Sequence, residues 1–342
     1  MKAVIFTQHG GPEALTYTDV PDPKPRPDEV LVRVRACALN HLDLWIRRGI
    51  PGIQIPMPHI NGSDVSGEIA AIGELVSDIP VGPKILLQPG IGCGRCVACL
   101  AGDDNLCRNY TLLGYLVNGG YAEYVCAPAR NVVPMPDGLS FEEGAAIPLV
   151  FITAWHMLVT RAKLQPGEDV LILGGGSGVG TAGIQIAKIL GARVITTVGS
   201  DEKAEKTRAL GADEVIVHTR QKISAEVKRI TNRRGVDVVF EHVGEATWPQ
   251  SVASLAVNGR LVTCGATTGF DAKIDLRFLF SRHLSLLGSY MGSKAELFPV
   301  LDLVARKKLH PVLDKVFPLA EAAAAHRRLE QREQFGKIVL RV

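Results

Sequence analysis

The sequence lacks the features that would direct a chain to a membrane or to a nucleic acid. No uninterrupted apolar stretch reaches the roughly 20 residues that a bilayer-spanning helix needs. The 38 Lys and Arg residues nearly balance the 35 Asp and Glu residues, and no basic face or acidic tail stands out. The N-terminal segment MKAVIFTQHGG is typical of a strand rather than of a signal peptide. We therefore expect a cytoplasmic protein with no membrane or nucleic-acid partner.

An even set of cysteines is also lacking, because the chain has seven. Cys37, Cys126 and Cys264 are isolated, whereas the other four lie between positions 93 and 107. An odd count in a cytoplasmic protein argues against a disulfide framework, so the cluster needs another explanation. The 342 residues are 46% hydrophobic, which is enough for two hydrophobic cores.

The first third of the chain has the pattern of a β-rich domain. In the segment 29–35, Val30, Val32 and Val34 alternate with charged or other residues, as expected for a strand with one face in water. Pro and Gly punctuate residues 21–58. Short strands between long loops predict an irregular, barrel-like domain.

Beyond about residue 150 the pattern changes to apolar strands that alternate with helices. Continuous apolar runs, typical of parallel strands buried on both faces, occupy residues 170–173, 194–198, 214–217, 236–240, 260–263 and 284–287. This alternation predicts an α/β doubly wound sheet of six parallel strands. The tail, residues 294–342, adds an amphipathic helix and a closing strand at 337–340.

A glycine-rich heptad, residues 174–180 (GGGSGVG), joins the first of these strands to a helix that Gly191 ends. Glycines allow a tight turn and a close approach of the backbone to a pyrophosphate, which faces the positive end of the helix. Between a strand and a helix, the motif predicts a dinucleotide site. The residues expected to form it are Gly175, Gly178, Val179 and Gly180.

The end of the second strand bears on the choice between NAD and NADP. An NAD site usually has an acid there for the ribose hydroxyls, but segment 198–200 (VGS) has none. Ser200 and Lys203 offer a hydroxyl and an ammonium to a 2′-phosphate, and His218 ends the next strand. We therefore expect NADP(H). Two alternatives stay open: Ser200 is the N-cap of the next helix, and Asp201 allows NAD(H).

The clustered cysteines have the spacing of a metal site. Cys93, Cys96, Cys99 and Cys107 are separated by two, two and seven residues. Four thiolates so spaced can close a tetrahedron around Zn²⁺ and leave no open position, as in a structural site. An iron–sulfur cluster and a pair of adventitious disulfides are the alternatives. We predict one structural zinc per chain.

Together these motifs resemble the zinc-containing alcohol dehydrogenases and quinone oxidoreductases of the medium-chain dehydrogenase/reductase superfamily, over essentially the whole chain. The resemblance implies a GroES-like catalytic domain at residues 1–149 with a zinc lobe at 90–110. It also implies a Rossmann domain at 150–289 and a C-terminal segment, 290–342, that returns to the catalytic domain. An NAD(P)-dependent oxidoreductase that acts on a small-molecule substrate, as a homodimer or homotetramer, is expected.

The catalytic zinc of that family has no matching ligands in this chain. The first ligand of the family, a Cys, is Asn40 here; the second, a His, is Ser63; the third, a Cys or an acid, matches Leu149. A catalytic zinc needs about three protein ligands and an open position, which Asn, Ser and Leu do not supply. The hydroxyl residue that relays the alcohol proton is Leu42 here. Zinc-assisted alcohol oxidation is therefore not expected.

What remains resembles the zinc-free quinone oxidoreductases, in which Asn40-x-x-Asp43 has a counterpart. By the same resemblance, His41 and Lys337 match basic positions that meet the cofactor pyrophosphate, and Thr153 matches the residue beside the nicotinamide. The candidate catalytic residues are therefore Asn40, Asp43 and Thr153. Their structural alternatives are a turn cap, an ion pair with a neighbouring Arg, and a core helix position.

We predict a reductase that transfers hydride from NADPH to an activated double bond, in a quinone or an enone, with Asn40 donating a hydrogen bond to the substrate oxygen. Water or the nicotinamide ribose supplies the proton. One rival is an alcohol or aldehyde dehydrogenase whose metal is held by atypical ligands such as His41, Asp43, His59 or Asp64. The other rival is a nucleotide-binding protein without turnover.

Overall fold

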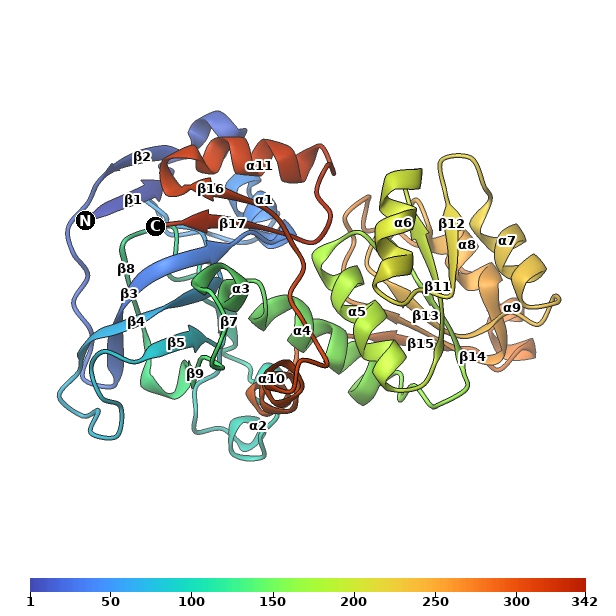
Figure 1. Ribbon diagram of the computed structural model, residues 1–342, viewed down its shortest axis with the longest axis horizontal. Coiled ribbons are helices and arrows are strands. Elements are labelled where there is room, and N and C mark those ends of the chain that lie inside the picture. Colours follow the sequence, from blue (N-terminus) through green and yellow to red (C-terminus); the bar gives the residue numbers. More distant parts are fainter. The chain divides into compact units, whose positions relative to one another are not determined.

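The structure is a computed structural model that describes residues 1–342, and the chain forms two compact units. Unit 1 comprises Met1–Leu149 and Ser293–Val342, and unit 2 comprises Val150–Gly292. The C-terminal segment therefore belongs to the same unit as the N-terminal third of the chain, and Figure 1 shows its last strand beside an early one.

Unit 1 is built on strands of mixed direction with a few short helices. Its strands are β1 (Lys2–Ile5), β2 (Thr16–Asp19), β3 (Glu29–Ala38), β4 (Asp64–Ile72), β5 (Lys84–Leu87), β6 (Gly90–Ile91), β7 (Thr111–Leu112), β8 (Tyr124–Pro128), β9 (Val132–Pro134), β16 (Leu313–Pro318) and β17 (Lys337–Arg341). Its helices are α1 (His41–Arg48), α2 (Val97–Leu100), α3 (Phe141–Ala145), α10 (Leu297–Ala305) and α11 (Ala322–Glu330), with 3₁₀ turns at Pro12–Ala14, Asp104–Leu106, Ala129–Asn131, Lys294–Glu296 and Leu319–Glu321.

The main sheet of unit 1 has seven strands in the order β16-β17-β3-β4-β5-β9, and β8 also pairs with β3. In β3 the side chains of Val30, Val32 and Val34 are buried whereas Arg33 and Arg35 are exposed, as the alternation predicts. The strand runs on to residue 38, further than the alternation alone indicates. Its last residues pair with β4 on one side and β17 on the other, which favours small apolar side chains buried on both faces.

Unit 2 is a six-stranded parallel sheet, which confirms the predicted doubly wound fold. The strand order is β12-β11-β10-β13-β14-β15. The strands are β10 (Asp169–Ile172), β11 (Arg193–Val198), β12 (Glu214–Val217), β13 (Val236–Glu241), β14 (Leu255–Thr263) and β15 (Ser285–Gly288). The helices are α4 (Pro148–Trp155, whose first two residues belong to unit 1), its π-helical continuation His156–Arg161, α5 (Gly178–Ile189), α6 (Asp201–Ala209), α7 (Ile223–Ile230), α8 (Trp248–Ser254) and α9 (Leu276–Ser281).

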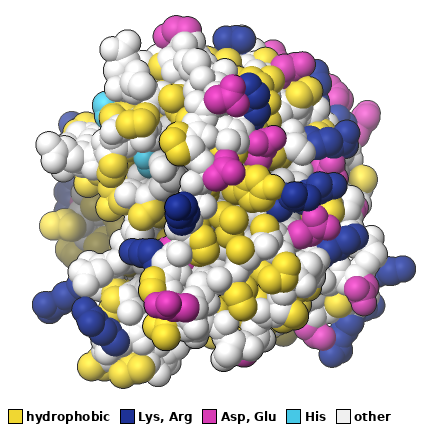
Figure 2. All heavy atoms as spheres, turned by 90° about the vertical axis from the view of Figure 1, so that its left-hand side faces the viewer, with side chains coloured by type: hydrophobic (Ala, Val, Ile, Leu, Met, Phe, Trp, Pro, Cys, Tyr) yellow, Lys and Arg dark blue, Asp and Glu magenta, His cyan; other side chains and the backbone are white.

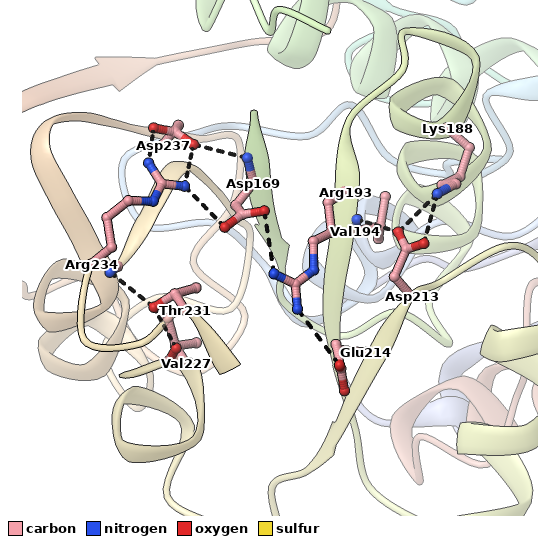
Figure 3. Close-up of polar contacts among 11 residues, drawn as sticks. Asp169, Lys188, Arg193, Val194, Asp213, Glu214, Val227, Thr231, Arg234 and Asp237 are labelled. Carbon is pink, nitrogen blue, oxygen red and sulfur yellow. Dashed lines mark hydrogen bonds and ion pairs between the residues drawn. The ribbon is translucent and has the colours of Figure 1, made fainter. Parts of the chain in front are cut away.

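Charged side chains link the amino-terminal ends of the unit 2 strands (Figure 3). Arg234 donates to Asp237 at 2.6 and 2.7 Å and to Asp169, at the start of β10, at 2.9 Å. Arg193, at the start of β11, lies 3.9 Å from Asp169 and 3.6 Å from Glu214 at the start of β12. This network lies at the amino-terminal ends of the strands. Ligands of α/β sheets of this kind bind at the opposite, carboxyl ends.

One helical run of the structure bears on the expectation that no segment spans a membrane. By length and composition Phe141–Arg161, which comprises α3, α4 and the π-helical turns, could cross a membrane. Glu142 and Glu143 interrupt its apolar pattern, which is why the sequence shows no uninterrupted run. Of its apolar window, 67% is buried inside the protein, as in a core helix of a globular domain.

The face of unit 1 shown in Figure 2 mixes both signs of charge with hydrophobic side chains. Ion pairs such as Lys2 with Asp19, and the N-terminal amine with Asp22, are among the exposed contacts of β1 and β2. Exposed pairs of this kind contribute little stability.

We predict that Arg234→Ala lowers the free energy of unfolding by roughly 1 kcal/mol at pH 7, the scale of a partly exposed ion-pair network. Burial acts to raise the pKa of Asp237, but hydrogen bonds from Arg234 and the Asp169 N–H outweigh it and hold that pKa below its ordinary value. The contribution is therefore complete above about pH 4 and is lost as the pH falls further.

Urea unfolding of the wild type and of Arg234→Ala at pH 7, 5 and 3 measures this difference. Arg277→Ala is the matched control, because its ion pair with Asp275 lies in the open, and it should leave stability unchanged. If the difference in unfolding free energy between the wild type and Arg234→Ala were as large at pH 3 as at pH 7, the assigned role of the Arg234–Asp237 ion pair would be contradicted.

Candidate active site

Three buried polar side chains of unit 1 meet at the ends of adjacent strands. Lys337 Nζ donates to Asn40 Oδ1 at 2.6 Å, to Asp64 Oδ2 at 2.9 Å and to the Leu39 carbonyl at 2.7 Å. Asn40 Nδ2 also donates to Asp64 Oδ2, at 2.9 Å. Asn40, Asp64 and Lys337 are 7%, 0% and 3% exposed. We call these three residues the ammonium cluster.

The strand order explains this convergence. β4 and β17 flank β3 on its two sides, with Ala38 opposite Asp64 on one side and opposite Val339 on the other. The three residues therefore lie at the same end of the sheet, although Lys337 is 297 positions from Asn40. The second oxygen of Asp64 accepts from the Leu149 N–H at 2.8 Å, so both carboxylate oxygens have donors.

Asp43 anchors this arrangement from the first turn of α1. Its Oδ2 accepts from the Asn40 N–H at 2.6 Å, and its Oδ1 accepts from the Gly62 N–H at 3.1 Å. Burial raises the pKa of Asp43 to about 7, against the opposing effect of the Asn40 N–H and of Lys337. The alternative in which Asp43 pairs with Arg47 is not what the structure shows, because Arg47 donates to the Gly10 carbonyl and pairs with Glu330.

The residues at the family's catalytic zinc positions do not fit that metal. The Asn40 amide oxygen accepts from an ammonium, which would repel Zn²⁺ from the same place. Ser63 Oγ is buried without a hydrogen-bond partner and is a neutral hydroxyl. Leu149 contributes only its backbone N–H. A catalytic zinc takes His, Cys or carboxylate ligands, and these three residues offer none.

The atypical ligands considered above are engaged in other contacts. Both oxygens of Asp43 accept backbone N–H groups, and Asp64 is neutralised by Lys337. His59 is buried, lies 3.0 Å by Nε2 from the Gly114 carbonyl and packs edge-on against a phenylalanine ring. His41, the first residue of α1, packs edge-on against Trp45.

The structure shows which groups the Lys337 ammonium contacts within unit 1. The resemblance assigns it to the cofactor pyrophosphate, but an ammonium has three N–H groups and all three donate within unit 1. Lys337 is the first residue of β17, which pairs with β3, and this position explains why its side chain contacts Asn40 and Asp64. The pyrophosphate roles of His41 and Lys337 stay predictions.

The glycine-rich turn of unit 2 has the close packing that a dinucleotide site requires. Gly174 has a φ of +58°, which favours glycine. A Cβ added at Gly175 would lie 2.2 Å from Thr196 Oγ1, and one added at Gly180 would lie 2.3 Å from the Gly174 carbonyl oxygen. Only glycine therefore fits at these positions, and the backbone is left accessible to a phosphate.

The first turn of α5 supplies the amides. Ser177 is the N-cap, and its Oγ accepts from the Gly180 N–H at 2.9 Å. The N–H groups of Gly178 and Val179 belong to the first turn and have no partner within the helix, so they can face an anion. These residues fit the pyrophosphate of a nicotinamide dinucleotide.

At the end of β11, Ser200 has one of the two roles that the sequence leaves open for it, and its role at a 2′-phosphate stays a prediction. Ser200 is the N-cap of α6 and accepts from the Lys203 N–H at 3.3 Å. His218 follows β12, and its Nε2 would lie 3.7 Å from a Cβ added at Gly199. The side chain of Asp201 is held by Arg220, with bonds of 2.5 and 2.6 Å.

Arg220 is a residue that the sequence interpretation missed. Its hydrogen bond lowers the pKa of Asp201 and occupies the carboxylate that directly follows Ser200 at this strand end. The pairing of β12 with β11 could have indicated this contact, because residues that follow two paired parallel strands are neighbours.

Thr153 is a buried residue of α4 whose hydroxyl donates to Met291 Sδ at 3.8 Å, and its role beside the nicotinamide stays a prediction.

The four clustered cysteines come together in the zinc lobe. Their Sγ atoms all lie within 4.8 Å of one another, and Cys93 Sγ is 4.0 Å from Cys99 Sγ. Sulfur atoms about 2.3 Å from a tetrahedral zinc would be nearly 4 Å apart, so the group fits Zn²⁺. Backbone N–H groups of Arg95 and Cys96 lower the pKa of Cys93 to about 6, which favours a thiolate. None of the cysteines is in a disulfide.

Comparison with known proteins identifies the class. Family models of the alcohol dehydrogenase GroES-like domain and of zinc-binding dehydrogenases match residues 26–137 and 178–306. An NAD-dependent alcohol dehydrogenase of Sulfolobus acidocaldarius is 34% identical over 100% of both chains, and a quinone oxidoreductase of Pseudomonas aeruginosa is 32% identical over 99% of both. A crystal structure of an NAD-dependent alcohol dehydrogenase matches with a TM-score of 0.97 and 47% identity over 100% of both chains.

The chain therefore belongs to the medium-chain dehydrogenase/reductase superfamily. It is an NAD(P)-dependent oxidoreductase with a GroES-like domain, a Rossmann domain, a zinc-binding cysteine cluster and a nicotinamide cofactor.

We predict one zinc per chain, bound at Cys93, Cys96, Cys99 and Cys107. Cys96→Ser should release the metal and lower the melting temperature, because metal binding is coupled to the folding of the lobe. Elemental analysis and thermal unfolding measure the two effects. Cys126→Ser, outside the lobe, is the control and should keep the full zinc content; iron in place of zinc would refute the assignment.

Proposed function

We propose that the protein is an NADP(H)-dependent reductase that transfers hydride to an activated double bond, in a quinone or an α,β-unsaturated carbonyl compound, without a catalytic zinc. The observation that carries this proposal is the Lys337 ammonium, which bonds Asn40 and Asp64 where a zinc enzyme of the family has its metal. The similarity to a quinone oxidoreductase supports the substrate class. The dimer or tetramer that the family resemblance implies stays a prediction.

Asn40 is the residue proposed to meet the substrate oxygen. Its amide nitrogen has two N–H groups, and one of them donates to Asp64. The other is available to an oxygen on which negative charge develops when the bound nicotinamide supplies hydride to the electron-poor carbon. Lys337 donates to the amide oxygen, and this charge-assisted bond polarises the amide and strengthens its N–H groups as donors.

Hydrogen bonds fix both the backbone and the side-chain amide of Asn40. Asp43 holds its backbone N–H at 2.6 Å, and Asp64 and Lys337 hold the two ends of its amide. A donor held in this way needs no reorganisation when the charge develops, which is the condition for electrostatic stabilisation.

We predict that Asn40→Ala lowers kcat of quinone or enone reduction by roughly 10²-fold, the scale of losing one donor to a developing oxyanion. The Kd of the cofactor, measured by fluorescence titration, should stay unchanged and serves as the control for folding.

Incubation with a mild chelator that leaves the protein folded should not lower the activity of the wild type. Loss of activity that added zinc restores would favour an alcohol dehydrogenase with atypical ligands. Absence of NADPH consumption across a quinone and enone panel would favour a binding protein without turnover.

The preference for NADP(H) rests on the end of β11. Arg220 holds the carboxylate of Asp201, so the nearest acid is not free to accept the ribose hydroxyls. Ser200 and the first turn of α6, which includes Lys203, follow β11, and His218 follows the neighbouring β12; Arg220 adds a second cation that suits a 2′-phosphate.

We predict that NADPH binds about tenfold more tightly than NADH, and that Lys203→Ala weakens only NADPH. Arg220→Ala should shift the preference towards NADH, because it removes a cation and releases Asp201. Fluorescence titration with both cofactors measures this, with Arg229→Ala, an exposed arginine of α7 that pairs with Glu226, as the control. Equal affinities in the wild type would point to Asp201 as a ribose ligand.

A further inference from the structure

His242 lies against the glycine-rich turn of unit 2, although it comes from a different strand. Its Nε2 is 2.7 Å from the Leu173 carbonyl oxygen, at the beginning of the turn, and 3.4 Å from Ser177 Oγ, the N-cap of α5. A Cβ added at Gly174 would lie 3.1 Å from the Cε1 of His242. The imidazole ring therefore contacts the start, the first glycine and the end of the turn.

The contact with the Leu173 carbonyl oxygen determines which nitrogen of the His242 ring carries the proton. A carbonyl oxygen only accepts, so Nε2 must carry the proton and donate to it. Burial lowers the pKa of His242, so the ring stays neutral and keeps this single role. The strand order explains the placement: β13 is the neighbour of β10, so the residue that follows β13 lies beside the turn that follows β10.

Glu241 holds the segment that carries His242. The Glu241 side chain is fully buried and accepts from the N–H groups of Val243 and Gly244, and from the hydroxyls of Thr247 and Ser251. A buried carboxylate with this many donors fixes the backbone on both sides of His242. The backbone that carries the imidazole is therefore held rigidly, as a positioning residue requires.

We propose that His242 is a positioning residue for the pyrophosphate of the nicotinamide dinucleotide. It acts through the turn: its N–H holds the Leu173 carbonyl and its ring packs on Gly174, so the amides of Gly178 and Val179 keep the orientation in which they meet a phosphate. The inference rests on the cofactor class that the family shares and not on the reduced substrate or on the choice between NADP and NAD.

A pair of variants separates a hydrogen-bonding role from simple packing. His242→Phe keeps an aromatic ring but removes the N–H, whereas His242→Gln keeps an N–H donor on a shorter, flexible side chain. We expect His242→Phe to raise the Kd of ADP-ribose, which has the pyrophosphate but no nicotinamide, by about tenfold, the scale of one hydrogen bond. His242→Gln should recover most of the affinity. NADH and NADPH should lose affinity by similar factors.

Two readouts distinguish positioning from a general loss of structure. The KM of the electron acceptor at saturating cofactor and the melting temperature of the cofactor-free protein should change little in His242→Phe. Unchanged affinity for ADP-ribose in that variant, or a His242→Gln variant as weak as His242→Phe, would overturn the proposal.

The wild type supplies a test that holds even if His242→Phe does not fold. Nitrogen-15 NMR of the histidine side chains should show His242 as the neutral Nε2–H tautomer, and its resonances should shift when ADP-ribose binds. A different tautomer, or resonances that ADP-ribose leaves unmoved, would contradict the role.

Discussion

The buried ammonium of Lys337 is a constraint on which the arrangement of unit 1 depends. Removing a charged side chain from water costs several kcal/mol unless hydrogen bonds and an opposite charge compensate it. Lys337 meets this demand with three acceptors, of which the Asp64 carboxylate carries the opposite charge. These contacts join the start of β17 to the end of β3 and the start of β4, and the same contacts set the orientation of the Asn40 amide.

The two ends of the unit 2 sheet have separate tasks. At the amino-terminal ends, Arg193 and Arg234 link acids at the start of neighbouring strands and stabilise the sheet. At the carboxyl ends, the turn after β10 is shaped by close contacts with Thr196 and His242 and leaves first-turn amides for a phosphate. Substitutions at one end should therefore affect stability, and those at the other should affect cofactor affinity.

Local patterns in the sequence were sufficient for most of the fold. The alternation in β3, the apolar runs of the six parallel strands and the glycine-rich turn each depend on neighbouring residues only, and the structure confirms them. The spacing of the cysteines likewise predicted a cluster that the structure brings together. Family resemblance supplied the candidate residues around Asn40, but not their contacts.

The contacts that define the candidate site depend on strand order and register, which a local pattern does not contain. Lys337 meets Asn40 because β17 pairs with β3, and a basic residue at that position offers no local sign that its partner is Asp64. In the same way, Arg220 meets Asp201 through the β11–β12 pairing, and His242 meets Leu173 through the β10–β13 pairing. Each of these contacts can be inferred once the order of the strands in the sheet is known.

We propose that the zinc of this protein has only a structural role and that the Lys337 ammonium occupies the position of the family's catalytic metal. X-ray absorption at the zinc edge, on protein saturated with zinc and freed of excess metal, tests it most directly. We predict a single shell of four sulfur atoms at about 2.3 Å from the zinc. A mixed shell with nitrogen or oxygen ligands at about 2.0–2.1 Å would show a second zinc site and contradict it.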